Sequence, residues 1–137
     1  MYVSDVPQDA EFDFIVVGSG SAGCAVTNRL TADGKHRVLL LEAGGEDSNP
    51  WIHIPAGVAK TVGNPSVDWR FETEPSPGLA YRRIPLPRGK VLGGTTAING
   101  MLYIRGTPPD YDGWRDAGNP GWGWNDVLPY FIRAENN

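Results

Sequence analysis

The first 44 residues limit the fold most, because a short apolar run is followed at once by a glycine-rich loop and a helical pattern. The run FDFIVV at residues 12–17 has the β-branched and aromatic composition of a buried strand. The segment SAGCAVTNRLTA at 21–32 places apolar and small residues at helical spacing, and RVLLL at 37–41 is a second continuous apolar strand. Residues 12–44 therefore predict a βαβ unit with parallel strands and a right-handed crossover, and hence an α/β fold.

The loop between the first strand and the helix reads Gly18-Ser19-Gly20-Ser21-Ala22-Gly23, which is the pattern G-x-G-x-x-G. A strand before it and a helix after it are the context in which this pattern indicates a dinucleotide-binding turn. Gly18 permits the tight turn, Gly20 lets the backbone approach a pyrophosphate, and Gly23 lets helix and strand pack closely. The helix that opens at Ser21 offers free N–H groups and its positive dipole end to the phosphates.

Glu42 ends the second strand, 19 residues after Gly23. A carboxylate at this place accepts hydrogen bonds from ribose hydroxyls and repels a 2′-phosphate. Ala43 follows it in the same loop and belongs to the same candidate site. This unit alone leaves both NAD and FAD open as ligands, because both contain adenosine diphosphate.

A second glycine-rich segment, RGKVLGGTTAINGMLYIRG, covers residues 88–106. The pair Gly93-Gly94 lets the main chain approach a flat or anionic group without obstruction by a Cβ atom, and consecutive N–H groups form an anion nest. Positive charge and hydroxyl donors accompany this pair: Arg88, Lys90, Thr95 and Thr96. The same letters also fit a plain glycine turn before a strand at residues 101–104, so both interpretations stay open on local grounds.

The proline-rich segment at residues 45–87 holds seven of the twelve prolines, which argues against a long helix there. A short helix at 54–62 and a short strand at 69–72 are expected. Trp69 is a candidate to lie near the ligand, and the other tryptophans are expected to serve packing.

Two helices are predicted in residues 107–137. Thr107 is the expected N-cap of the first helix, with Pro108 after it and Asp110 three residues after the cap. Asn125 is the expected cap of the second helix, with Asp126 near its positive end.

Composition excludes several classes of function. The net charge of -4, without a long charge run, argues against a nucleic-acid surface. The single cysteine, Cys24, excludes an internal disulfide and a cysteine-cluster metal site, and a small buried core residue is expected there. No apolar run approaches the roughly 18 residues of a membrane span, and the first residues lack the pattern of a signal peptide. A cytoplasmic protein without a metal site is expected.

The run GKVLGGTTAINGMLYIRGTPPDYD, taken as a whole, resembles the first signature of the glucose–methanol–choline (GMC) family of flavoprotein oxidoreductases. The opening FDFIVVGSGSAGCAVTNRL and RVLLLEAGG is similar to the family's FAD-binding start. The segments DWRFETEPSPG and NPGWGWNDVLPYF also resemble family segments in the same order. The resemblance covers residues 12–135, and within the family it is nearest to choline-dehydrogenase-like alcohol dehydrogenases and oxidases.

The resemblance implies FAD and a Rossmann-like FAD-binding unit with irregular segments that wrap the cofactor. The first glycine loop would hold the pyrophosphate, Glu42 the adenosine ribose, residues 88–96 the pyrophosphate and ribityl chain, and residues 99–101 the isoalloxazine. The implied cofactor-binding residues are Gly18, Gly20, Ser21, Gly23, Glu42, Ala43, Arg88, Leu92, Gly93, Gly94, Thr95, Asn99, Gly100 and Met101. The chain would divide into 12–44, 45–87, 88–106 and 107–137, without a substrate domain.

Ile98 stands where some members of the family carry a histidine that is bonded covalently to the flavin, which implies non-covalent FAD. The family's catalytic base is a histidine of the C-terminal part. His36 and His53 are the only histidines here, and solvated or packing roles are expected for both, so no catalytic residue is assigned.

The resemblance implies oxidation of a small alcohol to an aldehyde or ketone, with hydride transfer to flavin N5 and either oxygen or a quinone as acceptor. Activity would require a C-terminal remainder, expected as a second chain, and the assembled enzyme could form a homo-oligomer. Three alternatives stay open: an NAD-binding Rossmann enzyme, a non-catalytic nucleotide-binding piece, and a hydroxynitrile lyase on the same scaffold.

Overall fold

The computed structural model describes residues 6–7 and 9–135 and divides into two compact units, Met1–Met101 and Leu102–Asn137. Each unit is described by itself. The division falls inside the glycine-rich segment 88–106, so that its loop part lies in unit 1 and its aliphatic end in unit 2.

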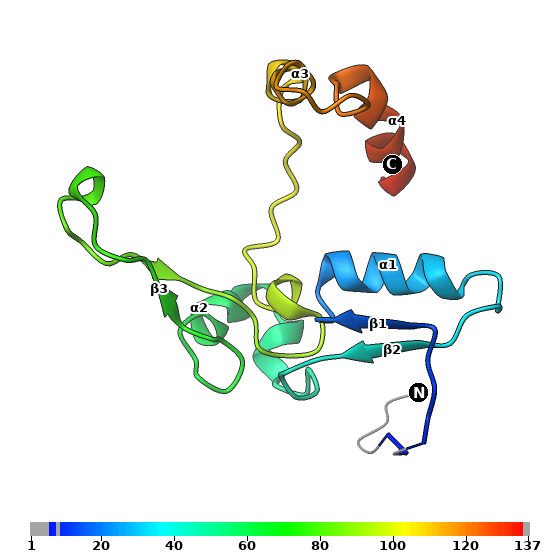
Figure 1. Ribbon diagram of the computed structural model, residues 1–137. Coiled ribbons are helices and arrows are strands. Elements are labelled where there is room, and N and C mark those ends of the chain that lie inside the picture. Colours follow the sequence, from blue (N-terminus) through cyan, green and yellow to red (C-terminus); the bar gives the residue numbers. More distant parts are fainter. Residues whose placement is uncertain (1–5, 8, 136–137) are drawn as a thin grey trace. The chain divides into compact units, whose positions relative to one another are not determined.

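A parallel pair of strands joined through a helix opens unit 1. β1 (Phe14–Val17) leads into α1 (Ser21–Thr31), and β2 (Val38–Leu41) returns beside β1 in parallel register from Phe14↔Val38 to Val17↔Leu41. The helix α1 contacts both strands and lies along the pair (Figure 1). The predicted order of strand, helix and parallel strand is confirmed, with each boundary within two residues of the prediction.

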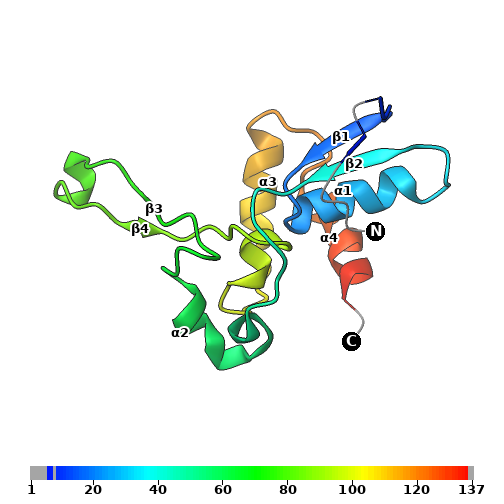
Figure 2. The same ribbon diagram turned by 90° about the horizontal axis from the view of Figure 1, so that it is seen from below.

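Three short helical turns follow β2 in the proline-rich segment: η1 (Pro50–His53), η2 (Pro55–Gly57) and α2 (Val58–Thr61). The expected short helix at 54–62 corresponds to the last two of them. β3 (Phe71–Glu72) pairs antiparallel with β4 (Pro85–Leu86), and the arm between them carries η3 (Pro77–Leu79) (Figure 2). The expected strand at 69–72 is thus found in its second half.

A small apolar core connects the proline-rich segment to the second glycine-rich segment. Val67, Val91 and Ile98 are buried at 4%, 1% and 2% exposure, and Ile52 and Ala97 pack against them. Ile98 directly follows η4 (Gly94–Ala97), so this core fixes the turn that carries the glycine pair Gly93-Gly94.

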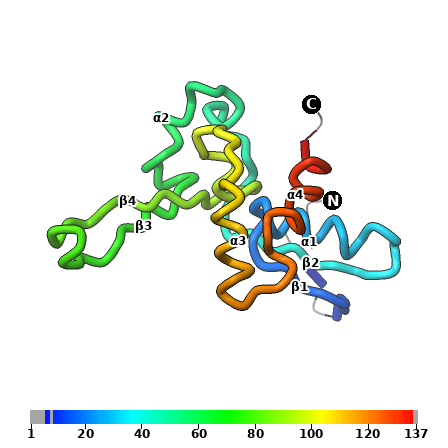
Figure 3. Tube along the Cα trace, turned by 90° about the horizontal axis from the view of Figure 1, so that it is seen from above, coloured from blue at the N-terminus to red at the C-terminus, as the bar shows by residue number. Residues whose placement is uncertain are grey.

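The described residues of unit 2 form two helices, α3 (Pro108–Asp116) and α4 (Trp124–Ala134). Figure 3 shows the two helices in chain order. They pack through Tyr111, which is buried and has ring contacts with Trp124 and Phe131 at centroid distances of 5.6 Å. The predicted cap of α3 is confirmed, because the N–H and hydroxyl of Thr107 both donate to Asp110 Oδ2 at 2.7 Å.

Two local predictions are wrong, and one of the two interpretations of residues 88–106 is not supported. Gly123, and not Asn125, is the N-cap of α4, and its N–H donates to Asp126 Oδ2 at 3.1 Å. Residues 101–104 form no strand, so a plain glycine turn before a strand does not describe this segment. Cys24 is exposed and not a core residue, and its thiol donates to the Ser19 carbonyl oxygen at 3.1 Å.

Among the helices of the described residues, none is both long enough and apolar enough to cross a membrane. Within residues 6–7 and 9–135, no three histidine, cysteine or acidic side chains cluster as a metal ion would require.

Candidate functional site

The first glycine loop makes a tight turn between β1 and α1. Gly18 adopts a left-handed φ of 95°, and its N–H donates to the Leu41 carbonyl oxygen at 2.7 Å. A Cβ atom on Gly23 would collide with the Gly18 carbonyl, so this glycine is required by packing within the protein. Gly20 is the N-cap of α1 and provides no side-chain cap, so the first N–H groups of the helix have no side-chain acceptor from that residue.

The second glycine pair lies directly against this loop. Gly93 and Gly94 both have positive φ, 93° and 59°, and a Cβ atom on Gly94 would stand 2.9 Å from Gly20 Cα. The Leu92 N–H donates to the Gly45 carbonyl oxygen at 2.8 Å, which ties the approach to this turn to the loop after β2. Two glycine motifs that are distant in sequence therefore form one surface of bare main chain.

Ser19 links the two glycine motifs through hydrogen bonds. Its side chain is fully buried, its N–H and hydroxyl donate to Glu42 Oε2 at 2.9 and 2.8 Å, and its Oγ accepts the Gly93 N–H at 3.1 Å. One hydroxyl thus connects the strand-end carboxylate to the second glycine pair.

Glu42 is half-buried and anchored within the protein. Its Oε1 accepts the Gly44 N–H at 2.9 Å, in addition to the two bonds from Ser19 at Oε2. Burial raises the pKa of this carboxyl, but the N–H and O–H donors of Gly44 and Ser19 more than offset burial, so the pKa lies below its ordinary value. The Ala43 N–H also interacts with this carboxylate and lowers its pKa, so three residues of the protein hold it in its charged form.

A pocket of about 550 Å³ opens where the two glycine motifs meet, and we call it the glycine-loop pocket. It brings together seven of the predicted site residues: Gly18, Gly20, Glu42, Ala43, Arg88, Gly94 and Thr95. The other lining residues are Val17, Leu41, Trp69, Phe71 and Gly89. A Cβ atom on Gly20 would meet no protein atom within 4 Å, so the space in front of this glycine is free for a ligand.

An aromatic wall bounds one side of the glycine-loop pocket. The rings of Trp69 and Phe71 stack at 5.7 Å with an interplanar angle of 6°, and Lys90 Nζ lies 4.6 Å from the Trp69 ring centroid. The expectation that Trp69 lies near the ligand site is consistent with this position. Lys90 brings a positive charge to the same wall, together with Arg88 in the lining.

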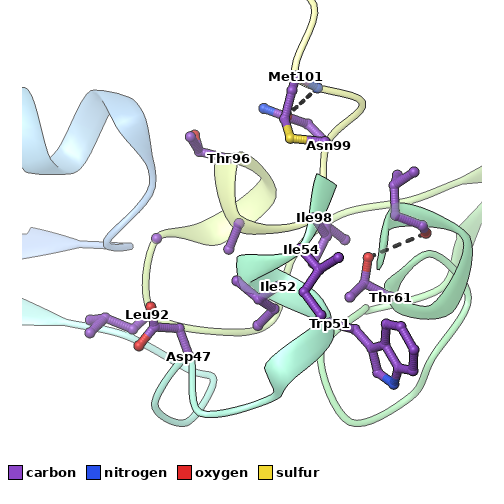
Figure 4. Close-up of a pocket in the computed structure, with 13 residues that line it drawn as sticks. Asp47, Trp51, Ile52, Ile54, Thr61, Leu92, Thr96, Ile98, Asn99 and Met101 are labelled. Atoms are coloured by element: carbon purple, nitrogen blue, oxygen red, sulfur yellow. Dashed lines mark hydrogen bonds between the residues drawn. The ribbon is translucent and has the colours of Figure 1, made fainter. Parts of the chain in front are cut away.

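A second pocket of about 320 Å³ lies beside η4 (Figure 4). It is lined by Asp47, Trp51, Ile52, Ile54, Val58, Thr61, Leu92, Gly93, Thr96, Ala97, Ile98, Asn99 and Met101. Figure 4 shows Asn99 and Met101 together after the turn, where Asn99 Oδ1 accepts the Met101 N–H at 2.8 Å. Met101 has a left-handed φ of 57°, a conformation that this bond supports.

The structure therefore distributes the predicted residues over two neighbouring pockets, four of them lining the second one: Leu92, Gly93, Asn99 and Met101. Ser21, Gly23 and Gly100 line neither pocket; Ser21 begins α1 and Gly23 packs under the first turn. His53 also lies outside both linings, and its Nε2 is 2.7 Å from the Asp47 carbonyl oxygen, as a loop role predicts.

Sequence reasoning missed Ser19 and Asp68, both buried polar residues that hold the pockets in shape. Ser19 occupies a position that the G-x-G pattern leaves free, so the pattern gives no signal for it. Asp68 sits beside Trp69 in the DW pair, and an aspartate next to a candidate pocket residue was a usable signal.

The GMC oxidoreductase family model matches residues 12–137. Oxygen-dependent choline dehydrogenase from Photobacterium profundum is 48% identical over 125 residues, which are 91% of this chain and 22% of that protein. The chain thus spans less than a quarter of the length of this curated relative.

Two solved structures are also similar. Pyridoxine 4-oxidase from Mesorbium loti matches with a TM-score of 0.81 and 42% identity over 88% of this chain and 24% of that one. A formate oxidase variant from Aspergillus oryzae RIB40, studied for its effect on FAD modification, matches with a TM-score of 0.81 and 30% identity, over 91% and 22% of the two chains. The family match extends over nearly the whole chain, and this chain belongs to the GMC oxidoreductase family.

Proposed function

We propose that this chain is the FAD-binding N-terminal part of an alcohol oxidoreductase that acts only with a C-terminal remainder. The observation that carries the proposal is the contact of Gly20 with Gly94, which brings two bare main-chain segments to one pocket. The similar proteins support FAD as the cofactor and an alcohol as the substrate. One relative is named a choline dehydrogenase, and one similar solved structure is a formate oxidase variant studied for its effect on FAD modification.

The residues present fit a dinucleotide. The first turn of α1 offers N–H groups and a positive dipole end to a pyrophosphate, and Gly20 leaves the approach open. Arg88 in the lining supplies positive charge, and the Glu42 carboxylate lines the same pocket as an acceptor for a ribose hydroxyl. Residues 12–44 and 88–96 would thus form the Rossmann-like part of the site.

The second pocket suits the flavin end of the cofactor, because it continues from Gly93 to Asn99 and Met101. Ile98 has a hydrocarbon side chain without a nucleophile and is 2% exposed in the core with Val67 and Val91. Its burial supports non-covalent binding of FAD.

When bound, FAD would supply a two-electron acceptor for oxidation of an alcohol to an aldehyde or ketone. The residues of this chain would bind and orient the cofactor and exclude water from its phosphates. Neither His36 nor His53 lines the glycine-loop pocket or the second pocket, so the group that takes the alcohol proton would come from the C-terminal remainder.

The assembled enzyme, this chain together with its C-terminal remainder, tests the proposal. We expect the enzyme to show visible flavin absorption, and acid precipitation to release the flavin into the supernatant. In the absence of oxygen, an alcohol should bleach the enzyme-bound flavin. Yellow colour in the acid pellet would contradict non-covalent binding. A protein without flavin absorption that binds NAD would contradict the cofactor assignment.

A matched pair of glycine variants ties the flavin to the glycine-loop pocket. We expect Gly20→Ala to release FAD on desalting with little loss of apoenzyme stability, because the added Cβ meets no protein atom but occupies ligand space. Gly45→Ala also adds a Cβ into open space, outside both pockets, and should retain FAD. Equal FAD retention by both variants would show that FAD does not bind in the glycine-loop pocket.

A further inference from the structure

Asp68 is a buried carboxylate that gathers three main-chain donors. It is 3% exposed; its Oδ1 accepts the N–H groups of Arg70 at 2.8 Å and Arg88 at 3.0 Å, and its Oδ2 accepts the N–H of Gly63 at 2.7 Å. These donors come from two stretches of chain, residues 63–70 and residue 88. Asp68 does not line either pocket, so it acts through the residues that it holds.

The segments held by Asp68 form the aromatic wall of the glycine-loop pocket. The Trp69 N–H donates to the Arg88 carbonyl oxygen at 2.8 Å, and the Lys90 N–H donates to the Val67 carbonyl oxygen at 2.8 Å. Trp69 and Arg88 both line the pocket. The carboxylate of Asp68 thus fixes the spacing between an aromatic ring and a cationic side chain that face the same ligand space.

The backbone next to Trp69 requires such an anchor. Arg70 has a left-handed φ of 56°, a strained conformation for a residue with a Cβ atom. The bond from its N–H to Asp68 Oδ1 compensates this strain. Because Trp69 lies between the two residues, loss of the bond would release the backbone that aims its ring.

We infer that Asp68 is a positioning residue for FAD binding, which holds Trp69 and Arg88 at the wall of the glycine-loop pocket. The inference rests on the proposed function. The role requires an ionised carboxylate with acceptors on both oxygens. An asparagine amide retains one oxygen, and its NH₂ group then faces a main-chain N–H.

The test compares Asp68→Asn with Asp110→Asn in the assembled enzyme. Asp110 is the matched control, since its carboxylate also holds main-chain N–H and hydroxyl donors but belongs to the cap of α3. Both variants should lower the melting temperature. We expect Asp68→Asn alone to raise the Kd for FAD about ten-fold, the effect of a lost charged hydrogen bond.

The outcomes separate the inference from the proposed function. If the wild-type enzyme does not bind FAD, the proposed function is contradicted. Wild-type enzyme that binds FAD, with an Asp68→Asn variant of equal affinity and lower melting temperature, overturns the inference alone, because it leaves Asp68 a purely structural role.

Hydrogen exchange of the wild-type enzyme decides the matter if Asp68→Asn does not fold. We expect FAD to slow amide exchange in residues 63–70 and 88–90 together, because one carboxylate holds both segments. Slower exchange at the two glycine motifs, with unchanged exchange at residues 63–70, would overturn the inference.

Discussion

At the scale of single residues, Glu42 shows how one side chain serves both the fold and a ligand. The sequence predicts a ribose acceptor from its position at the end of β2. The structure adds that this carboxylate accepts three hydrogen bonds from Ser19 and Gly44. This inner role could not be predicted, because it depends on a buried serine at a position that the glycine pattern leaves free.

The charge of Glu42 should make stability depend on pH. Its folded-state pKa is lowered from the ordinary 4.5, so its stabilisation is complete above that value and is lost as the pH falls through the folded pKa. We expect Glu42→Gln to lower the free energy of unfolding by about 1–3 kcal/mol at pH 7, through unmet donors at Ser19 and Gly44. The deficit should shrink below about pH 4.5.

Thermal unfolding of the assembled enzyme at neutral and acidic pH measures this difference. Glu46→Gln is the control, since Glu46 is an exposed carboxylate in the same loop and should change the melting temperature little. A Glu42→Gln deficit that stays constant from neutral to acidic pH would show that the carboxylate charge has no part in it.

At the scale of elements, the sequence predicts correctly those features that depend on neighbouring residues alone. The strand–loop–helix–strand order and the cap of α3 by Thr107 and Asp110 follow from spacing alone, and the structure confirms both. A strand at residues 101–104, one of the two interpretations that the sequence leaves open, does not form, because a strand requires a hydrogen-bonding partner and the described residues place none there. Pairing between distant segments cannot be read from a short apolar run.

The contact between the two glycine motifs gives a prediction for η4. We expect Gly94→Ala to lower the melting temperature and the affinity for FAD together, because its φ of 59° is left-handed and the new Cβ would stand 2.9 Å from Gly20 Cα. Gly78→Ala in η3 is the control, since its Cβ meets nothing within 4 Å. Wild-type stability and FAD affinity in Gly94→Ala would show that the motifs do not touch in solution.

At the scale of the molecule, each unit exposes apolar side chains that a stable protein would cover. Ile15 on β1 is 62% exposed, and Leu102 and Ile104 in unit 2 are 85% and 82% exposed. Exposed apolar surface of this kind indicates a site for further protein. The length of the relatives, of which this chain spans under a quarter, supports the same interpretation.

Chain 1–137 produced alone should therefore bind a dye specific for apolar surface strongly and self-associate. Co-production with the C-terminal remainder should lower the dye fluorescence and give a defined assembly by size-exclusion chromatography. A monomeric chain with weak dye fluorescence would contradict the expectation that a remainder covers these faces.

The bond from the Gly93 N–H to Ser19 Oγ also has a consequence for the order of folding. It joins residues 74 positions apart, so the chain between them must be closed into a loop before the contact forms. Closure of long loops has an entropic cost and slows folding, and such contacts form after the local turns and helices. A molecule that bridges both sides of this closure would shift the population toward the closed chain. Cofactor supply during synthesis would thus govern how much of the protein reaches its final form.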